Sequence, residues 1–217
     1  MNVAICIPHG ANIPVKFSLH LKLLEVHTLV TLPDLMIHYI EIDTHVVSLA
    51  RHNIVLKCNE AAVDYLFWLD DDVLPPADAL VRLLAHQKQF VSGLYFAREF
   101  PHRPQIYERV GTAFQTMHSY EEGLVEVGAV GHGCCLVHKT VYDLLSNVPV
   151  ATLYGRELSP WYEFLTTLGE DFYFCNRLVQ IGVPVLVDTT VKCKHLVQAE
   201  LGEEHFNQLK EAGVVTP

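Results

Sequence analysis

Basic side chains are scarce in this sequence, which has 15 lysines and arginines against 25 aspartates and glutamates. The formal net charge of −10 disfavours non-specific electrostatic binding to phosphate backbones or anionic membranes. Nucleic acid is therefore not an expected partner. A locally basic site stays open as an exception, and it would lie near Arg98, His102 and Arg103.

Long apolar runs are absent as well. The first residues, MNVAICIPHGANIP, offer one short apolar stretch before Pro8 and lack the basic start and long apolar centre of a secretory signal. No other run approaches the roughly 18 uninterrupted apolar residues that a membrane helix needs. These absences predict a cytoplasmic protein without a transmembrane segment.

Paired cysteines are missing too, because the six cysteines include no C-x-x-C pair and follow no regular framework spacing. They stand among apolar residues, which predicts buried free thiols in a reducing compartment. They are Cys6, Cys58, Cys134, Cys135, Cys175 and Cys193.

What the sequence has in quantity is hydrophobic residues, which make up half of it and suffice for one large domain with its own core. Short apolar runs of strand type alternate with stretches of helical period, the pattern of a sheet covered by helices. No repeat or linker divides the chain. The sequence therefore predicts a single α/β domain over residues 1–217.

The expected strands include VAICI, LMIHYIEI, YLFWL, FVSGLYF and VPVLVDTTVKCKHL. Helices are expected after Pro14, over residues 45–60, and at ADALVRLLAHQ, KTVYDLL, GEDFYF and EEHFNQLKEAG. Residues 97–123 are polar and predict a long excursion or mobile loop, and residues 146–168 predict a second irregular connection. Within the latter, Trp161 and Tyr162 are candidates to contact a ligand, to form a lid, or to pack in the core.

Three consecutive carboxylates follow the apolar run YLFWL. Ligands of open α/β sheets bind beyond the carboxyl ends of strands, where Asp70, Asp71 and Asp72 are expected. Magnesium and manganese prefer oxygen ligands, and a D-x-D spacing on a turning backbone can aim the first and third carboxylates the same way. The turn is either a divalent-cation site or a solvated acidic turn.

Weaker candidates lie elsewhere in the chain. Glu170 and Asp171 open a predicted helix, where carboxylates serve as an ordinary cap, as a general base, or as both. His195 stands near a strand end as a surface, core or ligand residue. Arg51 and Asn53 belong to a charged helix face or meet an anionic ligand. The glycines of GHG, residues 131–133, suggest that another group approaches the backbone closely.

Five segments in order carry a family resemblance, which extends from about residue 2 to residue 196. They contain VAICIPHGANIP, the ARHN helix with LDDDVLPP, VSGLYFARE, GLVEVGAVGHGCC and the GED helix with the late KHL. Together they resemble glycosyltransferases of the GT-A fold, and most of all the small family-2-like transferases of bacteria and phages. The resemblance implies a Rossmann-like, mixed and mostly parallel central sheet flanked by helices.

The resemblance also implies roles for individual residues. Asp70 and Asp72 match the ends of the D-x-D motif and, with His195, form the implied metal site for manganese (Mn2+) or magnesium (Mg2+). Asp171 resembles the catalytic base of inverting members, with Glu170 beside it. Residues 1–100 would bind the nucleotide sugar, and residues 101–217 would supply the acceptor and catalytic half. The implied nucleotide contacts are Pro8, His9, Asp43, Arg51, Asp70 and Asp71.

The implied function is metal-dependent transfer of a sugar from a nucleoside-diphosphate sugar, expected to be UDP-linked, to an acceptor hydroxyl with inversion. The acceptor would be a glycan, a small molecule or a protein. Two alternatives stay open. One is a nucleotidyltransferase acting on sugar phosphates, for which PHGANIPVK is a poor triphosphate loop. The other is a GT-A-like module that binds nucleotide or glycan without turnover.

Overall fold

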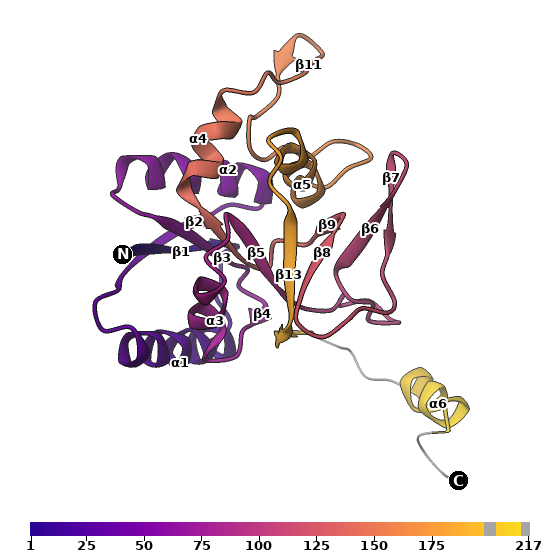
Figure 1. Ribbon diagram of the computed structural model, residues 1–217. Coiled ribbons are helices and arrows are strands. Elements are labelled where there is room, and N and C mark those ends of the chain that lie inside the picture. The colour runs from indigo at the N-terminus through magenta and orange to yellow at the C-terminus, as the bar shows by residue number, and fades with distance from the viewer. Residues whose placement is uncertain (198–202, 214–217) are drawn as a thin grey trace.

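The computed structural model of the protein describes residues 1–197 and 203–213. A seven-stranded sheet with strand order β2-β1-β3-β10-β5-β13-β8 forms its centre. Figure 1 shows helices on both faces of this sheet. The seven strands are β1 (Asn2–His9), β2 (Met36–Asp43), β3 (Tyr65–Leu69), β5 (Phe90–Leu94), β8 (Leu124–Val127), β10 (Cys134–His138) and β13 (Val185–Lys192).

Five of the seven strands run in one direction. Strand β1 is parallel to both β2 and β3, and β13 is parallel to β5. Strand β10 lies antiparallel between β3 and β5, so these two share their direction. At the far edge β8 is antiparallel to β13. The predicted mixed, mostly parallel α/β sheet flanked by helices is therefore confirmed.

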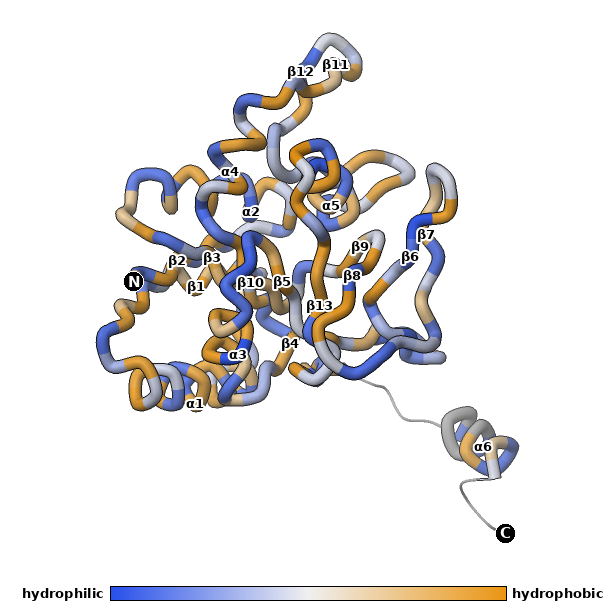
Figure 2. The backbone as a smooth tube through the Cα atoms, viewed as in Figure 1, coloured by the Kyte–Doolittle hydropathy of each residue, from blue (hydrophilic) through white to orange (hydrophobic). Residues whose placement is uncertain are grey.

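Helices α1 (Val15–Thr31) and α3 (Ala79–Ala85) cover one face, which is the lower one in Figure 1. Helix α1 begins after Pro14, whose fixed φ suits a helix start. Its buried side chains, Phe17, Leu24 and Thr28, follow the i, i+7 and i+11 spacing of one stripe. The outward side also carries apolar residues, including Leu19 and Leu23, so α1 shows both colours along its length in Figure 2.

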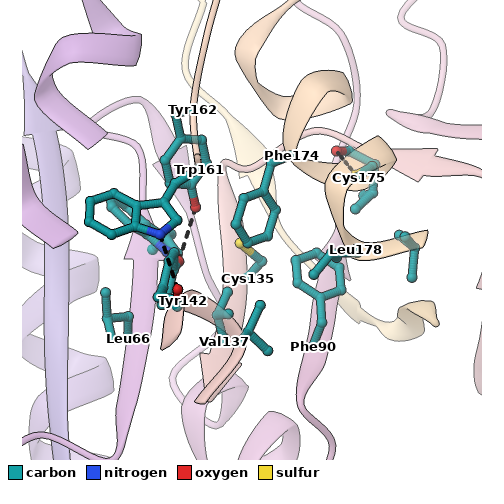
Figure 3. Packing of buried hydrophobic residues seen from close by; sticks show 14 of the residues in the cluster. Leu66, Phe90, Cys135, Val137, Tyr142, Trp161, Tyr162, Phe174, Cys175 and Leu178 are labelled. Atoms are coloured by element: carbon teal, nitrogen blue, oxygen red, sulfur yellow. Dashed lines mark hydrogen bonds between the residues drawn. The ribbon is translucent and has the colours of Figure 1, made fainter. Parts of the chain in front are cut away.

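Helices α2 (Val47–Glu60), α4 (Lys139–Ser146) and α5 (Glu170–Gln180) cover the opposite face. An aromatic cluster joins them to the sheet (Figure 3). The rings of Tyr162 and Phe174 stack with centroids 4.7 Å apart, and Trp161 donates from its indole nitrogen to the carbonyl oxygen of Tyr142. Trp161 and Tyr162 are buried, so of the roles predicted for them the packing role is the one the structure shows.

Residues 97–123 contain regular structure that the sequence prediction missed. Strands β6 (Ile106–Val110) and β7 (Ala113–Thr116) form a hairpin, and β6 also pairs with β9 (Ala129–Val130). The hairpin turns at Gly111, which has φ +62°. Aromatic side chains fix it to the rest of the molecule, because the rings of Tyr107 and Phe114 lie 4.7 and 5.0 Å from that of Phe172 on α5.

The remaining elements are short. Strands β4 (Val73–Leu74) and β14 (Lys194–His195) pair, as do β11 (Thr152–Leu153) and β12 (Arg156–Glu157), and α6 (Glu203–Glu211) is the last helix. All six cysteines are buried and free, as predicted. Within the described ranges, no helix has the length and apolar character needed to cross a membrane.

Candidate active site

A cavity of about 710 Å³ opens where parallel strands end. Its wall takes residues at or just after the ends of β1, β2, β3 and β5, so four strands deliver side chains to one place. In open α/β sheets this is the edge at which ligands bind. The lining residues are Pro8, His9, Gly10, Thr44, His45, Val47, Asp70, Asp71, Asp72, Tyr95, Ala97, Arg98, Glu99, Gln105 and His195.

Three carboxylates form the floor of the cavity at the turn between β3 and β4. The turn is closed by a hydrogen bond from the Val73 amide to the Asp70 carbonyl oxygen, at 3.0 Å. Burial raises the pKa of Asp70 despite the opposing effect of Arg51. Burial and the charges of Asp72 and Asp70 raise the pKa of Asp71. The three side chains are therefore not equivalent, although they are adjacent in sequence.

Asp72 has a cationic or hydrogen-bonding partner at each of its oxygens. Nε2 of His195 lies 3.3 Å from Oδ1, and Nη1 of Arg98 lies 2.9 Å from Oδ2. Burial opposes ionisation of Asp72, but these two partners outweigh it and lower the pKa of the carboxyl. Burial likewise works against protonation of His195, and the Asp72 carboxylate overcomes it and raises the pKa of the imidazole.

His195 is held in one orientation. Its Nδ1 lies 2.7 Å from the carbonyl oxygen of Phe96, and because a carbonyl only accepts, Nδ1 carries the hydrogen. The ring of Tyr95 meets it edge to face, with centroids 5.6 Å apart. In the neutral imidazole the Nε2 lone pair therefore faces Asp72. A lone pair facing a carboxylate is repulsive, so this arrangement is stable only when a proton or another cation lies between Nε2 and Asp72.

Arg51 lies beneath the cavity floor and joins two carboxylates. Its Nη2 donates to both oxygens of Asp70, at 2.8 and 3.1 Å, and its Nε donates to Glu170 at 3.4 Å. Its guanidinium also lies 5.4 Å from the centre of the Trp68 ring. Burial opposes the charge, but Asp70 and Glu170 outweigh it and raise the pKa of Arg51. This contact fixes the end of β3 to the start of α5.

Asp171 stands in the first turn of α5. Its Oδ1 accepts from the amide of Phe172 at 2.7 Å, and a Cβ on Gly169 would lie only 2.8 Å from the same oxygen. A Cβ at residue 169 would push the carboxylate aside, so the glycine of GED leaves room for it to fold back over the helix start. Burial, reinforced by the charge of Glu170, raises the pKa of Asp171 to about 7. A carboxyl with that pKa exchanges a proton near neutral pH.

Tyr95 approaches both glycines of the GHG segment, and Val73 also approaches Gly133. The Gly133 amide donates to its hydroxyl at 3.2 Å. A Cβ on Gly131 would lie 2.0 Å from that hydroxyl oxygen, and a Cβ on Gly133 would lie 2.9 Å from the ring carbon bearing it. Both glycines thus make room for a tyrosine that lines the cavity. Burial raises the pKa of Tyr95, and the charges of Asp70 and Asp171 raise it further.

The histidine of GHG points into the core. His132 lies among the rings of Phe90, Tyr162 and Phe174, with centroids 4.9 to 5.6 Å apart. Neither of its ring nitrogens has a hydrogen-bond partner within the part of the chain that the structure describes. Burial, together with the charge of Arg51, lowers its pKa well below the usual value, so the ring is neutral.

Comparison with known proteins gives a fold and no closer relationship. No family model and no curated protein matches the sequence. Among solved structures, A197 from STIV superposes with a TM-score of 0.57 and 17% identity, over 91% of this chain and 87% of that one. A structure of S. aureus TarS 1-349 in complex with UDP-GlcNAc superposes with a TM-score of 0.52 and 10% identity. That match covers 93% of this chain and 60% of the TarS chain.

The fold is GT-A-like. Within it, most of the residues singled out from the sequence gather at one site. Pro8, His9, Asp71 and the two ends of the D-x-D spacing line the cavity together with His195. Glu170 and Asp171 do not line the cavity, but Arg51 joins Glu170 to Asp70 and Asp171 is the next residue of α5. At the end of β2 the wall takes Thr44 and His45, and Asp43 lies one residue before them.

Other residues that line the cavity were not singled out from the sequence. Tyr95, Arg98 and Gln105 line the cavity, but Arg98 was considered only as part of a basic patch. The position of Tyr95 directly after a buried strand was a usable signal, the same one that marked the acidic turn. Arg51 was expected near a diphosphate, whereas its guanidinium is buried and turned to Asp70 and Glu170.

The donor set of the site fits a divalent cation in chemical type. Two carboxylates and one imidazole nitrogen are ligands that manganese accepts. The hydrogen bond from His195 Nδ1 to a backbone carbonyl is the usual support of a metal-binding histidine, and it directs Nε2 toward Asp72. The side chains are not arranged as a metal centre, because no group of three histidines, cysteines or carboxylates among the described residues is close enough to hold one.

Proposed function

We propose that the protein is a metal-dependent glycosyltransferase that moves a sugar from a nucleoside-diphosphate sugar to an acceptor hydroxyl with inversion. The observation that carries the proposal is the cavity at the strand ends. It combines an acidic floor at residues 70–72 with a backbone-anchored imidazole at His195. Asp171, a carboxyl with a pKa of about 7, directly follows Glu170, which Arg51 joins to Asp70.

Asp70, Asp72 and His195 are the residues that would hold the cation. When bound, it would supply a Lewis acid that neutralises the negative charge accumulating on the diphosphate as the glycosidic bond breaks. Arg51 keeps Asp70 in place from below, and its two hydrogen bonds to that carboxylate fix the orientation of the side chain. We assign Arg51 a positioning role rather than a contact with the diphosphate.

Asp171 serves as the general base. It takes the proton from the acceptor hydroxyl while that oxygen attacks the anomeric carbon from the face opposite the diphosphate, and the sugar inverts. Glu170 is held by Arg51 and raises the proton affinity of Asp171 through its charge. A positioned base of this kind contributes about 10²- to 10⁴-fold to a rate.

Residues 1–100 provide most of the cavity wall, and we assign this half to the nucleotide sugar. Residues 101–217 provide Asp171 and the β6–β7 hairpin that packs against α5, and we assign this half to catalysis and the acceptor. Uridine is the base to test first, because the structurally similar TarS was solved with UDP-GlcNAc. The acceptor class is a hydroxyl of a glycan, a small molecule or a protein.

A thermal-shift screen of UDP, GDP, ADP, CMP and their sugar conjugates, with and without Mn2+, tests this proposal. A ligand at about 100 times its Kd stabilises a fold by roughly 2.7 kcal/mol, which corresponds to about 5 to 10 °C for a chain of this size. We expect one nucleoside diphosphate to give a manganese-dependent shift. The shift should be lost in Asp72→Asn and retained in Asp143→Asn, a matched change on the exposed surface of α4.

The other outcomes separate the alternatives. No shift with any nucleotide would refute the proposed donor site. A shift without release of nucleoside diphosphate from any sugar conjugate would favour a binding module. A shift that requires a nucleoside triphosphate would favour nucleotidyl transfer.

A further inference from the structure

Arg98 is the cavity residue whose contact is least expected in a cation site. It projects from the turn between Phe96 and Gln105, which is closed by the bridge between Phe96 and Pro104 and by the hydrogen bond from the Ala97 amide to the Arg103 carbonyl oxygen. From there its Nη1 reaches Oδ2 of Asp72 at 2.9 Å. The Arg98 guanidinium thus binds the carboxylate that, in the proposed reaction, would bind a divalent metal ion.

Both oxygens of Asp72 are engaged, but not equally firmly. His195 on Oδ1 is fixed by the Phe96 carbonyl and the Tyr95 ring, and its side chain is 13% exposed. The Arg98 side chain on Oδ2 is 57% exposed, and water can readily replace its hydrogen bonds. The arginine is therefore the partner that yields when a stronger cation approaches Asp72.

The same ion pair separates two hollows. Asp72, Arg98 and Glu99 line the main cavity and also a second one of about 470 Å³, whose remaining wall is Leu196 and Val197. When Arg98 leaves Asp72, its guanidinium stays tethered at the rim of the main cavity. A planar guanidinium matches the oxygens of a diphosphate bound in that cavity.

We propose that Arg98 is an internal counter-cation for Asp72 that exchanges between the carboxylate and the donor diphosphate. Without donor it neutralises Asp72 and competes with divalent cations. With a nucleoside diphosphate in the cavity, the guanidinium turns to the phosphate oxygens and frees Asp72. Uptake of the cation and uptake of the diphosphate are thereby coupled. The inference rests on the proposed function, because it assumes that both bind in this cavity.

Titration calorimetry of Mn2+ alone, of UDP alone and of Mn2+ in the presence of saturating UDP tests the exchange on wild type, Arg98→Ala, Arg98→Lys and Arg103→Ala. In Arg98→Ala, Mn2+ alone should bind about 2- to 5-fold more tightly, which is the equivalent of a part-exposed ion pair. UDP should bind about tenfold more weakly because a charge-assisted hydrogen bond is lost. The gain in Mn2+ affinity caused by UDP should shrink accordingly.

The two other variants are controls. Arg98→Lys keeps the charge but not the planar fork, so Mn2+ alone should bind as in wild type while UDP binds with intermediate affinity. Arg103→Ala removes an arginine from the same turn and should leave all three affinities unchanged. Equal Mn2+ affinity in wild type and Arg98→Ala would overturn the exchange and leave the proposed function intact. Absence of Mn2+ binding in every variant, with and without UDP, would overturn both.

Discussion

Replacing Arg51 by methionine should expose how strongly the site depends on one buried charge. The arginine side chain is 2% exposed, and it faces Asp70 and Glu170, which are 26% and 12% exposed. Removing one member of a buried ion pair costs about 3 to 5 kcal/mol, because the remaining charge stays buried without compensation. We expect about 3 kcal/mol at pH 8 for Arg51→Met, at the low end because Asp70 is partly reached by water.

The penalty should depend on pH, and its sign follows from Asp70. Burial already raises the pKa of Asp70 in the wild type, and in Arg51→Met it should rise further because the opposing charge of Arg51 is gone. Groups of this kind stabilise the fold below the unfolded pKa, and that contribution is lost as pH rises through the folded one. The destabilisation relative to wild type should therefore be largest at pH 8 and should shrink toward pH 4.

Urea denaturation at pH 4.5, 6 and 8 measures this dependence. Arg177→Met is the matched control, because Arg177 is equally buried but donates mainly to backbone carbonyl oxygens, such as those of Val148 and Pro160. Removing Arg177 leaves no buried carboxylate among the described residues without a partner, so the loss of stability in Arg177→Met should not increase with pH. A penalty below about 1 kcal/mol for Arg51→Met, or one that is the same at all three pH values, would refute the reasoning.

Three further predictions concern Asp171 and Tyr95. Asp171→Asn should lower kcat for sugar transfer by about 10²- to 10⁴-fold with little change in donor KM, and steady-state kinetics would contradict the base assignment if kcat held. The wild-type rate should rise with pH to a plateau above about 7, where Asp171 is ionised. Because the folded-state pKa of Asp171 is raised, Asp171→Asn should be more stable than wild type at pH 8 but not at pH 4, as denaturation at both pH values would show. Gly131→Ala should lower the free energy of unfolding by about 1 to 3 kcal/mol, because the new Cβ would meet the Tyr95 hydroxyl. Tyr95→Phe should partly restore stability, and Gly10→Ala, whose Cβ meets open space, should cost much less. Additive energies in the double mutant would contradict this contact.

Local pattern was enough to predict the elements that run through the core. FVSGL and all of YLFWL but its first residue are buried, as are three of the four residues predicted as one stripe of α2, namely Ala50, Ile54 and Cys58. The fourth, Val47, begins the helix and is exposed. It was also enough to place the acidic turn, because a strand buried on both faces emerges at the sheet edge where it ends. Helix α5 ends near Gly182, which adopts φ +70° as expected of a glycine after a helix.

Pairing between distant segments could not be predicted in the same way. The hairpin of β6 and β7 was expected to be a loop because IYERV and AFQT are half polar, and only the rings of Tyr107 and Phe114 against Phe172 show why it is ordered. Insertion of β10 between β3 and β5 likewise depends on contacts across more than 40 residues, as in the pairing of Cys135 with Ser92. Period alone carries no such information.

The role of Arg51 could not be predicted from the sequence either. From sequence, an arginine upstream of an acidic turn is equally able to bind a ligand or to neutralise a neighbour, and only the depth of the helix in the fold decides between them. Here α2 places Arg51 in the protein interior, where its guanidinium forms ion pairs with Asp70 and Glu170. Arg98, on an exposed turn, keeps its charge at the rim of the cavity. Two arginines thus divide the work around one acidic turn, the buried one fixing carboxylates in place and the exposed one free to exchange partners.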